Sequence, residues 1–149
     1  MTKLSADSRS ALSRARLFLE KAQACSVDDR VDFEAYIEAA IIFARSALHR
    51  FKTKHEKDSG FQGWWKSLRG NPAVEFFRAE RDFVLKEAAP KIGQKVYVPS
   101  IGDSRTYVPT HAKELYYFES PDIPATDTIE GHLKDFEQTL RRADRWFSR

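Results

Sequence analysis

The sequence predicts an all-α protein, an antiparallel bundle of four to five helices with a small β-hairpin or extended flap inserted before the last helix. Apolar residues recur every three or four positions through most of the chain, the spacing that places them on one side of a helix. Gly and Pro are few, at six each, and fall mainly between these periodic segments. A chain of 149 residues can bury one core without disulfide bonds. We therefore expect a single domain over residues 1–149, with the flap at about residues 91–125.

The first two helices are expected in the N-terminal third of the chain. The first should run from about Ser5 to Cys25, with Ser5 as its N-cap. The stretch "CSVDDRVD" then restarts a helix with Ser26 as N-cap, and the second helix should extend from about Asp28 to Lys57. It is apolar around much of its circumference, which indicates a central helix packed on more than one side. Its main apolar face comprises Phe33, Ile37, Ile41, Ala44, Leu48 and Phe51.

A short helical turn is expected over residues 64–68, which include the Trp pair. The dipeptide Asn71-Pro72 is a strong helix start, because Asn caps well and Pro suits the first helical position. The next helix should run to about Ala89, where Pro90 stops it.

The periodicity changes in "KVYVPSIGDSRTYVP", where Val96 and Val98, and later Tyr107, flank a Gly-Asp turn region. This pattern predicts the hairpin or flap. The stretch "KELYYFESPDIP" either adds a short strand or stays irregular. The last helix should run from about Thr126 to Phe147. Its inward-facing residues are Ile129, Leu133, Phe136, Leu140, Ala143 and Phe147.

The net charge, the cysteine count and the length of the apolar runs exclude some classes of protein. The net charge of +3 creates no global field that demands nucleic acid, although it is compatible with RNA or an acidic partner. The single Cys25 excludes an intrachain disulfide and any multi-cysteine metal site, and it suits a reducing cytosol. No apolar run approaches the roughly 18 residues of a membrane span. We expect a soluble cytoplasmic protein with no membrane, metal or cofactor.

Charged residues crowd the middle of "FFRAERDFVLKEAAP". At about 100° per residue, Glu80 falls in the middle of the apolar face and Arg81 at its margin. By contrast, Arg78, Asp82 and Lys86 point away from it, with i,i+4 pairing expected from Arg78 to Asp82 and from Asp82 to Lys86. A buried carboxylate needs a partner or becomes neutral. Glu80 and Arg81 are therefore the unusual pair.

The second helix offers partners for Glu80. Its polar stripe includes Glu38, Arg45, His49 and Lys52, and Glu80 would meet Arg45 or His49 if the two helices pack together. Two interpretations remain open: an ion pair that fixes the register of the helices, or a polar pocket between them. For a pocket, the candidate ligand-binding residues are Arg45, His49, Glu80, Arg81, Asp82 and Lys86.

Three stretches, "YIEAAIIFARSALHRF", the Trp pair and "NPAVEFFRAERDFVLKEA", together resemble the HEPN superfamily of nucleotide-binding and ribonuclease domains. The resemblance covers roughly Ser5 to Ala89, and the final helix would close the bundle. Family members often form two-fold dimers in which two motifs face one cleft. The resemblance thus implies a homodimer that binds RNA, a nucleotide or a protein partner.

The nuclease motif of the family is incomplete in this chain. Members that cleave RNA carry an Arg, usually followed by Asn, His or Asp, and a His separated from that Arg by four to six residues. Arg81-Asp82 matches the first half, whereas Lys86, Glu87 and Ala88 occupy the His positions. A neutral His moves protons near pH 7, but a Lys is ordinarily protonated there and is a poor base. Arg81 retains the fork of donors that can clamp a phosphate.

A second Arg–His pair has similar spacing. Arg50 and His55 are separated by four residues, but Phe51 fills the expected polar position and the pair lies in the second helix. We expect no site there.

Three functions stay open, and the sequence favours the first. It is a non-catalytic HEPN-like protein that binds RNA, a nucleotide or a protein partner as a dimer. The second is a metal-independent endoribonuclease of toxin or defence type, in which Arg81 holds phosphate and His49 or Glu87 supplies the base. The third is a purely structural interaction protein, with the Trp pair and the flap as its interface. A basic groove at Arg81 would favour the first two, and a buried, internally paired Arg81 the third.

Overall fold

The computed structural model describes residues 6–87, 92–94, 109–118 and 122–147, and these residues form the predicted all-α bundle with one small sheet. The main helices are α1 (Ala6–Ala24), α2 (Arg30–His55), α3 (Phe61–Ser67), α4 (Pro72–Glu87) and α5 (Ala125–Phe147). Two short 3₁₀ helices, η1 (Leu68–Gly70) and η2 (Ala112–Glu114), and two short strands, β1 (Gly93–Gln94) and β2 (Tyr116–Tyr117), complete the elements.

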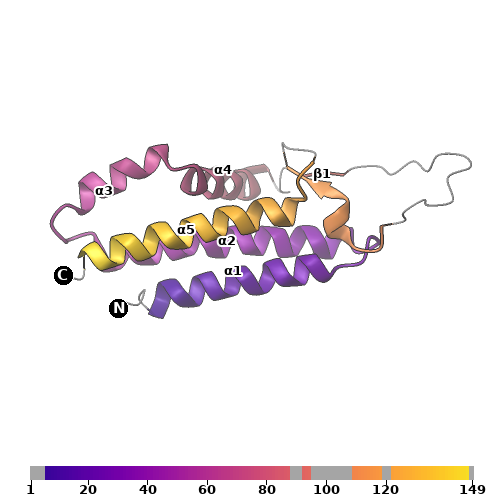
Figure 1. The fold of residues 1–149 in the computed structure, drawn as a ribbon, viewed down its shortest axis with the longest axis horizontal. Helices are drawn as coiled ribbons and strands as arrows, with labels where there is room; N and C mark the ends of the chain where they lie inside the picture. The colour runs from indigo at the N-terminus through magenta and orange to yellow at the C-terminus, as the bar shows by residue number, and fades with distance from the viewer. Residues whose placement is uncertain (1–5, 88–91, 95–108, 119–121, 148–149) are drawn as a thin grey trace, which may run out of the picture.

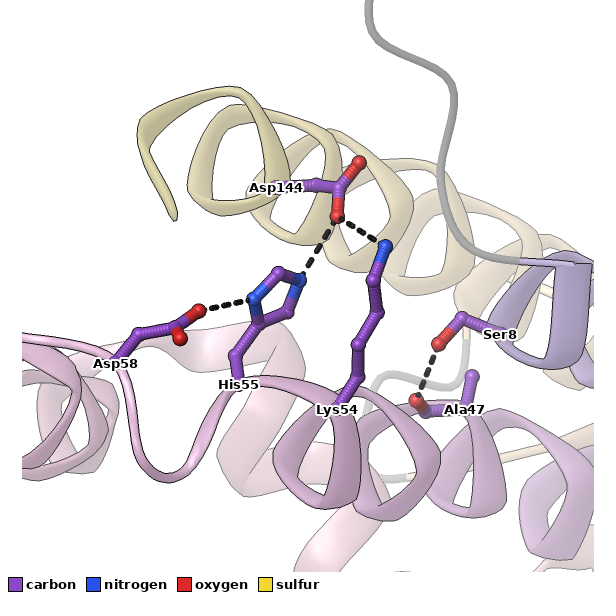
Figure 2. Close-up of polar contacts among 6 residues, drawn as sticks. All are labelled: Ser8, Ala47, Lys54, His55, Asp58 and Asp144. Atoms are coloured by element: carbon purple, nitrogen blue, oxygen red, sulfur yellow. Dashed lines mark hydrogen bonds and ion pairs between the residues drawn. The ribbon is translucent and has the colours of Figure 1, made fainter. Parts of the chain in front are cut away.

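The four long helices alternate in direction, so that the two ends of the chain lie at the same end of the bundle (Figure 1). Helix α2 is central, because it packs against α1, α4 and α5. Its apolar face is fully buried, and Phe33, Ile37 and Phe51 have no exposed surface. The hydroxyl of Ser8 in α1 donates to the carbonyl of Ala47 at 3.2 Å and ties the two helices together (Figure 2). The expectation of a central second helix is confirmed.

Helix boundaries follow local signals in most places. Helix α4 begins at Pro72, and the Oδ1 atom of Asn71 accepts from the N–H of Val74 at 3.1 Å, so the predicted start is confirmed. Asp29 rather than the predicted Ser26 occupies the N-cap position of α2, and its side chain makes no capping hydrogen bond. Ser26 instead forms a β-bridge with His111, and a tertiary contact has therefore displaced the local cap. The predicted cap at Ser5 lies outside the described residues.

The segment before α5 covers one end of the bundle. The stretch "KELYYF" does form a short strand, in which Tyr116 and Tyr117 pair antiparallel with Gln94 and Gly93. The Tyr116 ring stacks on Phe33 of α2, with 4.6 Å between ring centroids. The strands expected around Val96, Val98 and Tyr107 lie outside the described residues.

Candidate functional site

Helices α2, α3, η1 and α4 line a cavity of about 440 Å³. Four of its lining residues are basic and only one is acidic. The basic residues come from different elements, so the fold rather than one sequence motif gathers them. They are Arg45 of α2, Lys66 of α3, Arg69 of η1 and Arg78 of α4, and the acidic residue is Glu75. The remaining walls are apolar: Leu48, Trp65, Leu68 and Val74.

Arg45 is the most buried charge of this cavity, with 9% of its surface exposed. It lies between Ala44 and Leu48 on the buried side of α2. Among the described residues, its Nε atom has no hydrogen-bond partner. Burial lowers the pKa of the guanidinium, and the nearby charge of Arg81 acts in the same direction. Asp82 and Glu75 act in the opposite direction, yet the pKa of Arg45 stays lowered, so an anion in the cavity would further stabilise the buried guanidinium.

Arg78 stands at the rim of the cavity and is already paired. Its Nη2 and Nε atoms donate to Oε2 of Glu75 at 2.6 and 3.1 Å, and the hydrogen bond to Glu75 raises its pKa. The predicted Arg78–Asp82 pair is present at 3.9 Å. In the described part of the chain, Asp82 also pairs with Arg81 at 3.5 Å, rather than with Lys86 as predicted. Glu75 is therefore a closer partner of Arg78 than Asp82 is.

Arg45, His49 and Arg81 share one electrostatic environment between α2 and α4. The pKa of His49 is lowered by partial burial of the ring, and the charges of Arg45, Arg81 and Lys52 lower it further. Arg81 itself is 38% exposed in its side chain and touches Asp82. Arg81 is thus partly exposed and paired with Asp82, and its charge acts on Arg45 and His49 although Arg81 does not line the cavity.

Glu80 occupies a different face of α4 from Arg81. The carboxylates that act on the pKa of Arg45 are Asp82 and Glu75, and Glu80 is not among the groups that shift Arg45 or His49. Glu80 follows Phe76 by one helical turn, and Phe76 packs against Phe118 and His132. Its stripe therefore faces β2 and α5, and the expected meeting of Glu80 with Arg45 or His49 finds no support.

The two remaining candidates lie toward the end of α4. Lys86 is exposed. The side chain of Glu87 is outside the described residues.

The sequence analysis missed the contributions of Trp65, Lys66 and Arg69. The stretch "WWKSLRG" carried a usable signal, since it places two cations beside an aromatic pair in a short helix. Its role depends on where α3 and η1 fold back, which periodicity alone does not give. Lys52 lies over the Trp65 ring at 5.0 Å and adds another cation near this wall.

A second charged cluster lies at the C-terminal end of α2 (Figure 2). His55 approaches Oδ2 of Asp58 through Nδ1 at 2.7 Å, and Oδ1 of Asp144 through Nε2 at 3.0 Å. Lys54 lies 3.6 Å from the same Asp144 oxygen. Each ring nitrogen therefore lies within hydrogen-bond distance of a carboxylate oxygen. A ring committed in this way is not a free base.

The Arg50–His55 spacing therefore makes no site. Arg50 donates instead to the backbone carbonyl of Asp7 at 3.1 Å. The two side chains have separate partners, as expected from the apolar Phe51 between them.

Comparisons of the chain with protein-family models, with curated proteins and with solved structures found no match. Within the described ranges, no helix combines the length and apolar character needed to cross a bilayer. In the same ranges, no three His, Cys, Asp or Glu side chains gather as a metal site would require. Fold and geometry together define the class: a helical bundle with a cationic cavity between its helices.

Proposed function

We propose that this protein is a HEPN-like helical protein that binds a phosphate-bearing ligand, a nucleotide or RNA, without cleaving it. The observation that carries the proposal is Arg45, which is nine-tenths buried, has an Nε atom without a partner among the described residues, and lines a cavity with four basic residues and one acidic residue. A phosphate group supplies the missing negative charge and accepts from the guanidinium fork.

The dimensions and walls of the cavity favour a ligand larger than a simple ion. Its volume of about 440 Å³ lies in the range typical of small-molecule sites, roughly 300–1,000 Å³. Cations approach from several elements, which suits a group with oxygens on more than one side. Trp65 contributes an aromatic wall, and aromatic rings commonly stack on bases. These features favour a nucleotide unit over a carboxylate.

The absence of cleavage is supported by the altered motif. Lys86 stands where the family's nucleases carry a His, and His55 is committed to two carboxylates. His49 is the remaining candidate base, since its lowered pKa favours a neutral ring at pH 7.

The proposal also includes a homodimer and a cytoplasmic location. The dimer rests on the resemblance alone. The location is supported by the lone Cys25, which is free and buried. A protein partner remains the alternative occupant if neither RNA nor nucleotide binds.

The test is a fluorescence-anisotropy titration of an end-labelled single-stranded RNA, with AMP as competitor and a chelator present. The same samples are run on a denaturing gel to detect cleavage. The variants are Arg69→Ala and Arg78→Ala, and the control is Arg9→Ala, an exposed arginine of α1. We expect each cavity variant to weaken binding about tenfold, as for a lost charge-assisted hydrogen bond, and the control to leave it unchanged.

Three results would overturn this proposal. The wild type does not bind RNA or AMP; all three variants bind equally well; or the wild type cuts the RNA and Arg81→Ala does not. The last result would establish the ribonuclease alternative and make His49 the next residue to replace.

A further inference from the structure

We propose that His55 is a positioning residue for the cationic cavity: its ring, held between Asp58 and Asp144, fixes the segment that carries part of the cavity wall. That segment consists of α3 and η1, residues 61–70, and it supplies Trp65, Lys66, Leu68 and Arg69. The inference rests on the proposed function, because it concerns how the same site is held in shape.

The His55 ring joins three parts of the chain. It belongs to the last turn of α2, while Asp58 lies in the connection to α3 and Asp144 lies near the end of α5. The side chains of His55 and Asp144 are 4% and 1% exposed, so their interaction is shielded from water. The Oδ2 atom of Asp144 has no hydrogen-bond partner among the described residues. Asp144 therefore depends on His55 and Lys54 for its polar contacts.

The backbone of Asp58 connects the end of α2 to the start of α3. Its backbone N–H donates to the carbonyl of His55 at 2.9 Å, and its own carbonyl accepts from the N–H of Phe61 at 3.2 Å. Phe61 is the first residue of α3, and its ring packs at 5.8 Å from that of Phe147 in α5. Gly60, with φ of 82°, adopts the left-handed conformation that the reversal between α2 and α3 requires. Restraining the Asp58 side chain thus restrains the start of α3.

The segment is too short to be a stable helix on its own, so its position depends on contacts with the rest of the bundle. Helix α3 has seven residues and η1 has three, whereas isolated helices below about 12 residues are marginal in water. Its far end is tied to α5 where Nδ2 of Asn71 donates to Oγ1 of Thr139 at 3.3 Å. We call His55, Asp58 and Asp144 the clamp. Arg78, by contrast, lines the cavity from α4, a helix of sixteen residues that the clamp does not contact. Loosening the clamp should therefore displace Arg69 and leave Arg78 in place.

The test is a double-mutant cycle read by affinity for the end-labelled RNA. Asp58→Ala removes the clamp at a side chain that is 41% exposed, so the buried core is left intact. Arg69→Ala and Arg78→Ala are then each made with and without Asp58→Ala. We expect Asp58→Ala to weaken binding severalfold, and the effect of Arg69→Ala to shrink from about tenfold to about threefold or less in its presence. The effect of Arg78→Ala should stay at about tenfold.

Two further variants separate positioning from general loosening. Asp58→Asn keeps an acceptor for the ring and should restore part of the affinity lost in Asp58→Ala. Asp135→Asn, an exposed carboxylate on α5, should change nothing.

The inference is overturned if Asp58→Ala binds RNA as the wild type does, or if the effects of Arg69→Ala and Arg78→Ala shrink equally. It is also overturned if Asp58→Asn restores nothing. Failure of the proposed function is a different result, in which the wild type does not bind RNA at all.

Discussion

The two charged clusters on α2 are built from similar side chains and have opposite properties. At the end of the helix, two basic residues, Lys54 and His55, meet two acidic residues, Asp58 and Asp144, within 3.6 Å. At the cavity, four basic residues meet one acidic residue, and the Nε atom of Arg45 has no hydrogen-bond partner among the described residues. In the first cluster each acidic side chain lies against a basic one, whereas in the second the basic side chains are in excess. The difference indicates that the first holds the fold and the second holds a ligand.

The energetic logic follows from the cost of burying charge. In a closed cluster, each charge offsets the desolvation of its neighbour, so removal of one member exposes the full cost of the others. In the open cluster, the cost is already present in the folded protein, and removal of the buried member relieves it. Substitutions in the two clusters should therefore have opposite effects on stability.

The largest effect is expected in the closed cluster. Asp144→Asn removes a carboxylate that is 1% exposed and leaves His55 and Lys54 without their buried partner. We expect a loss of about 3–5 kcal/mol in the free energy of unfolding, measured by urea denaturation. Asp135→Asn on the exposed side of the same helix is the control, expected within about 0.5 kcal/mol of the wild type. A loss below about 1 kcal/mol for Asp144→Asn would show that the cluster is not closed.

The second prediction concerns the cavity, where removal of a charge should not lower the free energy of unfolding. Arg45→Met keeps an unbranched stem in the same place and removes the buried charge, so the free energy of unfolding should change by less than about 1 kcal/mol or should rise. RNA affinity should fall at least about tenfold. Urea denaturation and anisotropy are measured on the same preparation. A stability loss as large as that of Asp144→Asn would mean that Arg45 is a structural charge with an internal partner.

The smallest effect concerns His49 and pH. Its pKa in the folded protein lies below the ordinary value of 6.5, so the unfolded chain binds more protons in the interval between the two values. Stability therefore rises with pH through this interval, and the penalty is absent above it. His49→Gln removes the penalty, so the variant should melt higher than the wild type at pH of about 5 and equally at about 8. A difference in melting temperature of equal size at both pH values would contradict the lowered pKa of His49.

Local signals explain what could be predicted of the fold. The Asn71-Pro72 start and the apolar face of α2 depend on side chains within a few residues of one another. The N-cap predicted at Ser26 was wrong for a non-local reason, because Ser26 pairs with His111, which follows it much later in the chain.

The site was harder to predict because α4 packs on two sides. A helical wheel finds one apolar face, yet α4 packs against both α2 and α5. Neighbouring residues differ by about 100°, so a wheel alone does not say which charge of α4 acts on α2, where the structure has Arg81 near Arg45 and His49.

The cavity and the clamp also depend on contacts between distant segments. Asp144 lies 89 positions from His55. Arg45 could be named as a candidate from sequence, but its missing partner is visible only in three dimensions.

The most direct test of the central claim is the melting temperature of the wild type and of Arg45→Met as pyrophosphate is increased at constant ionic strength. Constant ionic strength removes the general screening that any salt produces. A ligand that binds only the folded protein raises its melting temperature by mass action. We predict a rise for the wild type that saturates, and none for Arg45→Met. Equal rises in both proteins, or no rise in the wild type, would contradict an anion site at Arg45.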